Sequence, residues 1–126
     1  MATIDLTNDN FISTINNNGI ILIDFWAPWC GPCRQFAPVF ESMSESHPDM
    51  VFAKVNTEEE QQLAAQFQIR SIPTLMVFRD EIIVFSQPGA LPPAQLATVI
   101  EKVAALDMDE VRRQIAEQSN DEEGQA

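Results

Sequence analysis

Basic residues are scarce in this chain of 126 residues. Seven lysines and arginines stand against 19 aspartates and glutamates, which gives a net charge of −12 at pH 7. A charge of this sign repels phosphate groups, so it argues against nucleic acid or an anionic membrane as a partner. Solubility is a sufficient explanation of the charge by itself.

Long apolar runs and targeting signals are missing as well. The sequence has no run of about 18 apolar residues, which a transmembrane helix requires. Residues 1–9 contain neither the basic nor the apolar segment of a secretory signal. We therefore expect a cytoplasmic protein. In that reducing compartment a close cysteine pair is more often catalytic or metal-binding than structural.

Soft metal ligands are also few. The chain has two cysteines, Cys30 and Cys33, and one histidine, His47. A structural zinc site needs four ligands, so half of a zinc site is a weak alternative and we expect no metal. A purely structural disulfide is the other weak alternative, given the compartment. A Cys-X-X-Cys pair between a strand and a helix instead predicts a dithiol that cycles with a disulfide.

Apolar periodicity predicts a single α/β domain at residues 1–106. Its strands are expected at 4–6, 20–23, 51–55, 75–78 and 82–85. Its helices are expected to begin near Thr7, Cys30, Thr57 and Pro92. Strands and helices alternate at first, and two neighbouring strands follow. This order favours parallel crossover units joined to an antiparallel hairpin in one mixed sheet between helix layers.

Two threonines are expected to cap helices. Thr7 precedes the first helix, and Thr57 forms a Thr-x-x-Glu capping box with Glu60. In each case the side-chain oxygen would accept a hydrogen bond from a backbone amide of the first turn.

An acidic residue, Asp24, interrupts the central apolar run at residues 20–27. An isolated carboxylate is unstable in apolar surroundings, so burial should raise the pKa of Asp24 until it accepts a proton near neutral pH. The alternative is a paired core carboxylate with no kinetic role.

The two cysteines are expected to differ in reactivity. The attacking species in thiol-disulfide exchange is the thiolate. Cys30 stands at the first turn of a helix, where the unpaired amides and the helix dipole can lower the pKa of a thiol to about 7. Cys30 should therefore attack a substrate disulfide, and Cys33, one turn further in, should be more buried and resolve the mixed disulfide.

The motif Phe25-Trp26-Ala27-Pro28-Trp29-Cys30-Gly31-Pro32-Cys33 resembles the active-site signature of the thioredoxin family. The resemblance continues through residues 37–38, 52–56, 69–74 and 89–90, and covers roughly residues 3–106. It implies the thioredoxin fold, a five-stranded mixed β-sheet flanked by four helices. It also implies a general protein-disulfide reductase, because the Gly31-Pro32 pair is similar to that of the reducing members rather than the oxidants and isomerases.

The same resemblance implies a set of supporting residues. It places Asp24 behind the cysteines as the base that deprotonates the resolving thiol, with Lys54 as its charge partner. It makes Pro73 a cis-proline that turns the backbone of Ile72 toward a bound peptide, an ordinary trans proline being the alternative. The expected substrate contacts are Trp29, Gly31, Pro32, Ile72, Pro73, Gly89 and Ala90.

Two positions depart from the family pattern. Many members have Asn-Gly or Asp-Gly where this chain has Asp80-Glu81, which favours another turn type in the hairpin. An acid often follows the asparagine of the third strand, whereas Thr57 follows Asn56 here.

The function we predict is dithiol/disulfide exchange on diverse disulfide-containing proteins. The resemblance implies no bound cofactor besides the redox-active disulfide Cys30–Cys33, and regeneration by a thioredoxin reductase that uses NADPH. We expect a monomer. The competing class is a non-catalytic thioredoxin-fold binding or chaperone module that uses the acidic C-terminal extension.

The extension after Leu106 exceeds the usual length of the family. Asp107 and Glu110 predict a short helix at 107–118, whose apolar stripe needs a surface to bury it. The stripe consists of Met108, Val111 and Ile115.

We expect this helix to pack near the strand at 82–85 or near the helix that precedes the extension. A fraying extension and a docking element for a specific partner are the alternatives. Residues 119–126 contain no large apolar side chain and are predicted to form a disordered acidic tail.

Overall fold

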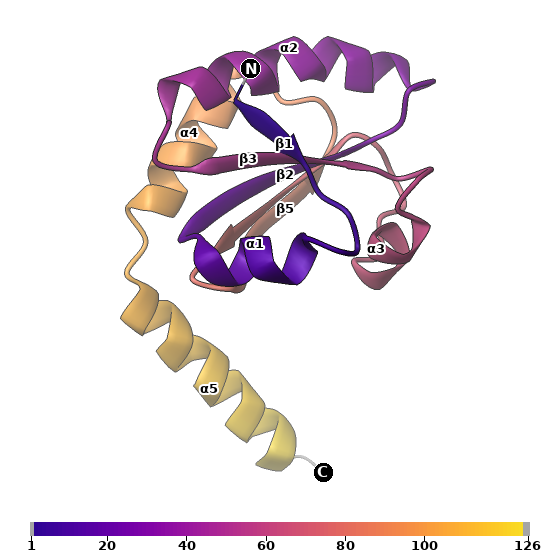
Figure 1. Ribbon diagram of the computed structural model, residues 1–126. Helices are drawn as coiled ribbons and strands as arrows, with labels where there is room; N and C mark the ends of the chain where they lie inside the picture. The colour runs from indigo at the N-terminus through magenta and orange to yellow at the C-terminus, as the bar shows by residue number, and fades with distance from the viewer. Residues whose placement is uncertain (1, 125–126) are drawn as a thin grey trace.

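A computed structural model describes residues 2–124, and within them five strands form one sheet between two layers of helices (Figure 1). The strands are β1 (Thr3–Asp5), β2 (Ile20–Trp26), β3 (Val51–Asn56), β4 (Thr74–Arg79) and β5 (Ile82–Pro88). The helices are α1 (Phe11–Asn17), α2 (Gly31–Ser46), α3 (Gln61–Gln66), α4 (Pro93–Ala104) and α5 (Met108–Gly124). In the described part of the chain, no helix combines the length and the apolar character needed to span a bilayer.

The sheet has the strand order β1-β3-β2-β4-β5 and is mixed. Strands β1, β3 and β2 are parallel, whereas β4 runs antiparallel to both β2 and β5. The parallel pairs require long crossovers, which α1 and α2 supply, while a short turn suffices between β4 and β5. The predicted mixed sheet with four flanking helices is confirmed, and α5 is added to it.

The central strand β2 separates two hydrophobic cores. Successive side chains of a strand point to opposite faces, so Ile21, Ile23 and Phe25 pack with α1 and α3. Leu22 packs on the other face with the apolar side chains of α2 and α4. Asp24 is two residues after Leu22, so its side chain points to the same face of the sheet. This is the α2 side, where the cysteines also lie.

The two predicted threonine caps are wrong. Helix α1 begins after Asn10, whose side chain accepts a hydrogen bond from the Thr7 amide at 2.7 Å. Helix α3 begins after Glu60, and the Thr57 hydroxyl instead donates to the Trp26 carbonyl at 3.0 Å. Thr57 thus ties the end of β3 to the end of β2, a tertiary contact that competes with local capping.

The hairpin turn also differs from the expectation. Both Asp80 and Glu81 have positive φ angles, 52° and 70°, as the type I′ turn of two-residue hairpins requires. The expected change of turn type is therefore wrong. The Asp80 amide donates to the Gly19 carbonyl at 2.8 Å, which secures the turn against the start of β2.

The C-terminal end of α4 is held by Arg79 of β4. One nitrogen of its guanidinium, Nη1, donates to the carbonyls of Val103 and Leu106, each at 2.7 Å, and to that of Ala104 at 3.2 Å. These carbonyls lie in the last turn of α4 and just after it, where a positive charge interacts favourably with the negative end of the helix dipole.

Replacing Arg79 with methionine is expected to lower the free energy of unfolding by about 2 kcal/mol, because three carbonyls lose a charged donor. Urea denaturation measures the change. Arg113→Met is the control, since Arg113 makes only exposed pairs with Glu110 and Glu117, and should change stability by less than about 0.5 kcal/mol. Equal losses in the two variants would contradict the role given to Arg79.

Helix α5 runs beyond residue 118, where we expected it to end, to Gly124. The predicted helix end is therefore wrong. The last two residues of the predicted disordered tail, 125 and 126, lie outside the described residues. Asp107 caps the helix as predicted, since its carboxylate accepts hydrogen bonds from the amides of Asp109 and Glu110.

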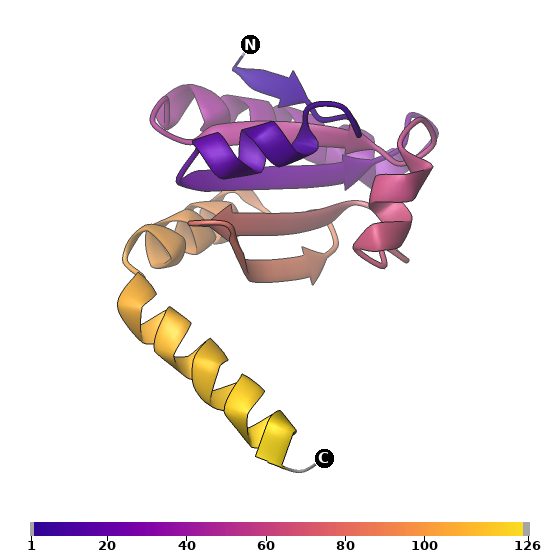
Figure 2. The same cartoon turned by 60° about the horizontal axis from the view of Figure 1, so that its bottom comes forward.

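The first turns of α5 lie beside β5, as expected, but they cover the apolar stripe only in part, since Ile115 is 43% exposed. Met108 is buried, and Val111 and Ile115 line a hollow together with Ile82 and Ile83 of β5. Farther along, α5 leaves the domain, as both views of the ribbon show (Figures 1 and 2).

Candidate active site

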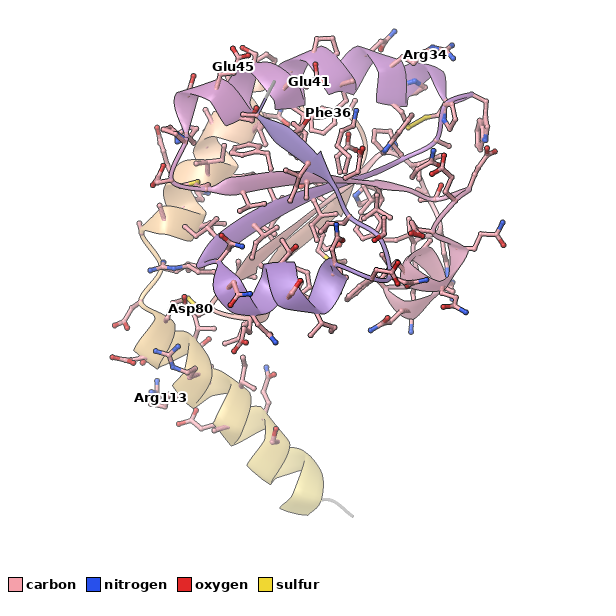
Figure 3. All side chains as sticks on the ribbon, viewed as in Figure 1. Arg34, Phe36, Glu41, Glu45, Asp80 and Arg113 are labelled. Carbon is pink, nitrogen blue, oxygen red and sulfur yellow. A yellow bond between two sulfur atoms is a disulfide. The ribbon has the colours of Figure 1, made fainter. Side chains whose placement is uncertain are left out.

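The cysteine pair lies where β2 gives way to α2. The chain turns after Trp26, with the Cys30 amide donating to the Ala27 carbonyl at 3.2 Å. Cys30 is the N-cap residue of α2, and Cys33 lies in its first turn. The two form a disulfide with their Cα atoms 5.2 Å apart. Figure 3 shows this disulfide at the end of α2 that carries Arg34.

The backbone around Cys30 suits a sulfur anion. The Cys33 amide donates toward the Sγ atom of Cys30 at 3.2 Å, in the way an N-cap side chain accepts from the first turn. A thiolate at this place would keep that hydrogen bond and face the positive end of the helix dipole. The helix start therefore favours Cys30 as the thiolate once the disulfide is reduced.

Both cysteines are largely covered in the disulfide form. Cys30 is 5% exposed and Cys33 is 2% exposed, in a small cluster with Ala27, Trp26 and Ile72. Cys30 is thus the more accessible residue of the pair, as expected, although by a small margin.

Asp24 is fully buried, and neither of its carboxylate oxygens has a hydrogen-bond partner among the described residues. Its carboxylate is therefore not paired through a hydrogen bond within the described residues. Burial raises the pKa of Asp24 to about 7, although the positive charge of Lys54 acts in the opposite direction. Asp24 can consequently exchange a proton close to neutral pH.

Lys54 lies opposite Asp24 in the register of β2 and β3. Its Nζ atom stands over the ring of Trp26, 4.7 Å from the ring centroid, which is a cation–π arrangement. Lys54 thus acts on Asp24 through its charge while the Trp26 ring holds its ammonium group. Trp26 is accordingly part of the scaffold of the site.

The cis-proline segment closes the other side of the disulfide. The peptide bond Ile72-Pro73 is cis, which confirms that prediction. The Ile72 carbonyl oxygen lies 3.7 Å from the Sγ atom of Cys30. The Gly89 amide donates to the Pro73 carbonyl at 2.8 Å, and Gly89 has φ of 104°, which few other residues adopt. The structure therefore brings Cys30, Ile72, Pro73 and Gly89 together.

The remaining predicted contacts surround the disulfide from the other elements. Trp29 is 65% exposed next to Cys30, and Pro32 is exposed in the first turn of α2 with the half-buried Gly31 before it. Ala90 is exposed and follows Gly89 directly.

Glu58 is a member of the site that the sequence did not reveal. It accepts a hydrogen bond from the indole Nε1 of Trp29 and so fixes the ring beside Cys30. The residue is the first of three consecutive glutamates after Thr57, a run that resembles a solvated loop. Only the folding of β2 against β3 brings that loop to Trp29, so local pattern carries no signal for this contact.

The described residues contain no group of three cysteine, histidine or carboxylate side chains placed to hold a metal ion. The reactive groups that the structure places on this side of the sheet are the two cysteine sulfur atoms and the buried carboxyl group of Asp24.

Comparisons with known proteins agree with this geometry. The family model named Thioredoxin matches residues 2–102. The chain is 56% identical over 117 residues to putative thioredoxin 2 of Streptomyces coelicolor, covering 93% of this chain and 87% of that protein. It is 44% identical over 105 residues to thioredoxin of Alicyclobacillus acidocaldarius, covering 79% of this chain and all of that one.

Solved structures show the same relationship. The structure of Plasmodium falciparum thioredoxin superposes with a TM-score of 0.73 at 35% identity, covering 79% of this chain and 97% of that one. The 117 residues aligned with the Streptomyces protein exceed the length of the domain, so that similarity continues into α5. The chain therefore belongs to the thioredoxin family, and its Cys30–Cys33 pair is a redox-active disulfide for dithiol/disulfide exchange.

Proposed function

We propose that the protein reduces disulfides of other proteins, with Cys30 as the attacking thiol and Cys33 as the resolving thiol. The position of Cys30 as the N-cap of α2, with the Cys33 amide directed at its sulfur, is the observation that carries this assignment. Cys33 lies deeper in the helix, where a substrate sulfur reaches it less easily.

The exchange proceeds in two balanced steps. The Cys30 thiolate attacks one sulfur of the substrate disulfide, which forms a mixed disulfide and releases the other substrate sulfur as a thiolate. Cys33 then gives its proton to the Asp24 carboxylate and attacks the Cys30 sulfur. The Cys30–Cys33 disulfide forms, the second substrate sulfur leaves, and two electrons have passed to the substrate.

The substrate would lie across the exposed surface around the disulfide. The Ile72 backbone can pair with an extended peptide, and Trp29 offers an apolar ring beside Cys30. Gly31, Pro32, Gly89 and Ala90 complete this face without charged side chains, and the buried Pro73 lies beneath it. Such a surface suits many different protein disulfides.

The proposal includes a catalytic cycle in which the Cys30–Cys33 disulfide is reduced again after each turnover. The oxidised protein would be reduced again by a thioredoxin reductase that draws electrons from NADPH, and the protein would work as a monomer in the cytoplasm. That reducing compartment is where a reductant of this kind is useful. No tightly bound cofactor takes part in these steps.

Reduction of insulin, driven by NADPH and a thioredoxin reductase, tests the proposal. We expect NADPH consumption that scales with the amount of this protein, and a reduction potential of the Cys30–Cys33 couple below about −200 mV. A higher potential would identify an oxidant or isomerase. Absence of turnover would favour the non-catalytic binding module.

Removing the hydrogen-bond acceptor of Trp29 should weaken substrate binding. We expect Glu58→Ala to raise KM for insulin about fivefold with little change in kcat, since an exposed hydrogen bond contributes about 1 kcal/mol to holding the ring in place. Glu58→Gln keeps an acceptor and should retain most of the affinity. Steady-state kinetics measures KM for both variants. Equal KM values for Glu58→Ala and Glu58→Gln would contradict the role of Glu58.

A further inference from the structure

The base of α5 is fixed to the thioredoxin domain. Met108 is 6% exposed, and Arg79 holds the carbonyl of Leu106 just before the helix. Arg112 lies 3.8 Å from Asp80 of the hairpin turn, so a charged pair joins the helix to the sheet. Figure 3 shows Asp80 and Arg113 close to this junction. The angle at which α5 leaves the domain is therefore set by contacts within the chain.

A hollow of about 240 Å³ lies between the edge strand β5 and this helix. We call it the edge groove. Ile82, Ile83 and Val84 form its strand side, Val111 and Ile115 form its helix side, and Leu106 lies between them. A second hollow of about 540 Å³, between β5 and α4, shares Val84 and Leu106 with it. The apolar residues of the two hollows thus meet at β5, with Gln114 and Gln118 of α5 and Lys102 of α4 among the polar residues that line the hollows beside them.

The edge groove leaves apolar side chains in water. Ile83 is 45% exposed and Ile115 is 43% exposed, although each faces the other element across the groove. β5 is also the last strand of the sheet, so one of its edges has no strand beside it within residues 2–124. An apolar surface of this kind, shaped before any partner arrives, needs little ordering on binding.

The charge around the edge groove is negative. Residues 107–119 contain four acids and two bases, and Asp80 and Glu81 add two exposed carboxylates at the hairpin turn. Arg112 pairs with Asp109, and Arg113 pairs with Glu110 and Glu117, so these pairs leave a net excess of acid on the helix and the turn. A second copy of the chain would bring the same excess of acid to the contact, which disfavours self-association.

We propose that the edge groove binds a basic amphipathic segment of a partner protein. Its apolar side chains would fill the space between Ile83 and Ile115, and its lysines or arginines would face the acids of α5. The complementary charge speeds association and selects against acidic segments.

The edge groove lies away from the active site. The disulfide sits at the Arg34 end of α2, while Asp80 and Arg113 mark the opposite side of the molecule (Figure 3). A bound segment would therefore leave Cys30 open to its substrates. This arrangement allows the partner to localise the reductase near particular substrates without blocking disulfide exchange at Cys30.

Nuclear magnetic resonance titration of the full-length, ¹⁵N-labelled protein tests the proposal. The probe is a peptide of leucine and lysine in an amphipathic pattern, about as long as α5. We expect amide shifts concentrated at residues 82–84, 106 and 111–118, and binding that weakens as salt is added. The same peptide with glutamate in place of lysine should bind at least tenfold more weakly.

The double variant Ile83→Ser, Ile115→Ser removes the two exposed apolar side chains and should weaken binding at least tenfold. Ile12→Ser is the matched control, because Ile12 of α1 is 63% exposed and does not line the edge groove, and it should change the affinity less than twofold. Equal weakening by both changes, or shifts spread over the whole acidic surface, would overturn the proposal. A dimer in sedimentation equilibrium that the double variant abolishes would assign the groove to a second copy instead.

Discussion

Replacing Cys30 with serine is expected to abolish the reduction of protein disulfides. Serine cannot form the mixed disulfide, and Cys33, 2% exposed inside the first turn of α2, is poorly placed to attack a substrate itself. Insulin reduction with NADPH and thioredoxin reductase should fall to the rate measured without this protein. The loss follows from the geometry that makes Cys30, rather than Cys33, the N-cap of the helix.

Replacing Cys33 with serine should have a different result. Cys30 can still attack, but the mixed disulfide has no neighbouring thiol to resolve it. We expect one substrate molecule to be captured per protein, visible as a single adduct by mass spectrometry and released by a thiol reagent. Catalytic turnover should be lost.

The pair of variants decides the order of the two thiols. A stable adduct with Cys30→Ser and none with Cys33→Ser would reverse the assignment. Both variants lose the disulfide, so the reduced wild-type protein is the matched control for folding. Neither change removes a side chain from the two cores on the faces of β2, so circular dichroism should show similar spectra.

The parts of this structure that were predictable are those that depend on local pattern. The apolar run at residues 20–23 could be assigned to a central strand because few other elements bury both faces. The strand-to-helix position of Cys30 followed from the residues on either side of it. The cis bond at Pro73 was predicted from the family resemblance. No physical pattern in the sequence distinguishes a cis proline from a trans proline at this position.

Contacts between distant segments were the parts that pattern did not predict. Thr57 is a reasonable cap in sequence, but its hydroxyl has a better acceptor in the Trp26 carbonyl, which only the folded sheet brings near. Glu58 and Arg79 are surface-like residues in sequence. The first fixes Trp29 and the second holds the end of α4, and both effects arise from the packing of one strand against another element.

Replacing Asp24 with asparagine is expected to stabilise the protein at alkaline pH. The pKa of Asp24 is about 7 in the folded protein against 3.8 as its ordinary value, which applies when the chain is unfolded. Between these two pH values the native state keeps a proton that the unfolded state has released. Native stability therefore falls as pH rises through this window, by about 4 kcal/mol in all.

Asparagine at position 24 cannot ionise, so this part of the pH dependence should vanish. From pH 5 to pH 8 the free energy of unfolding of the wild type, relative to the variant, should fall by about 3 kcal/mol, with most of the loss complete by pH 7. Urea denaturation of the oxidised proteins at both pH values measures it. Asp49→Asn, at an exposed position after α2, is the control and should leave the pH dependence of the wild type unchanged.

The same variant should be slower while it is more stable. Without a carboxylate behind the cysteines, Cys33 must lose its proton to water, and we expect insulin reduction at pH 8 to slow roughly 10- to 100-fold. Rates equal to those of the wild type from pH 6 to pH 9 would reject Asp24 as the base. If Asp24→Asn is more stable but slower than the wild type, the buried carboxylate costs stability and serves the resolving step.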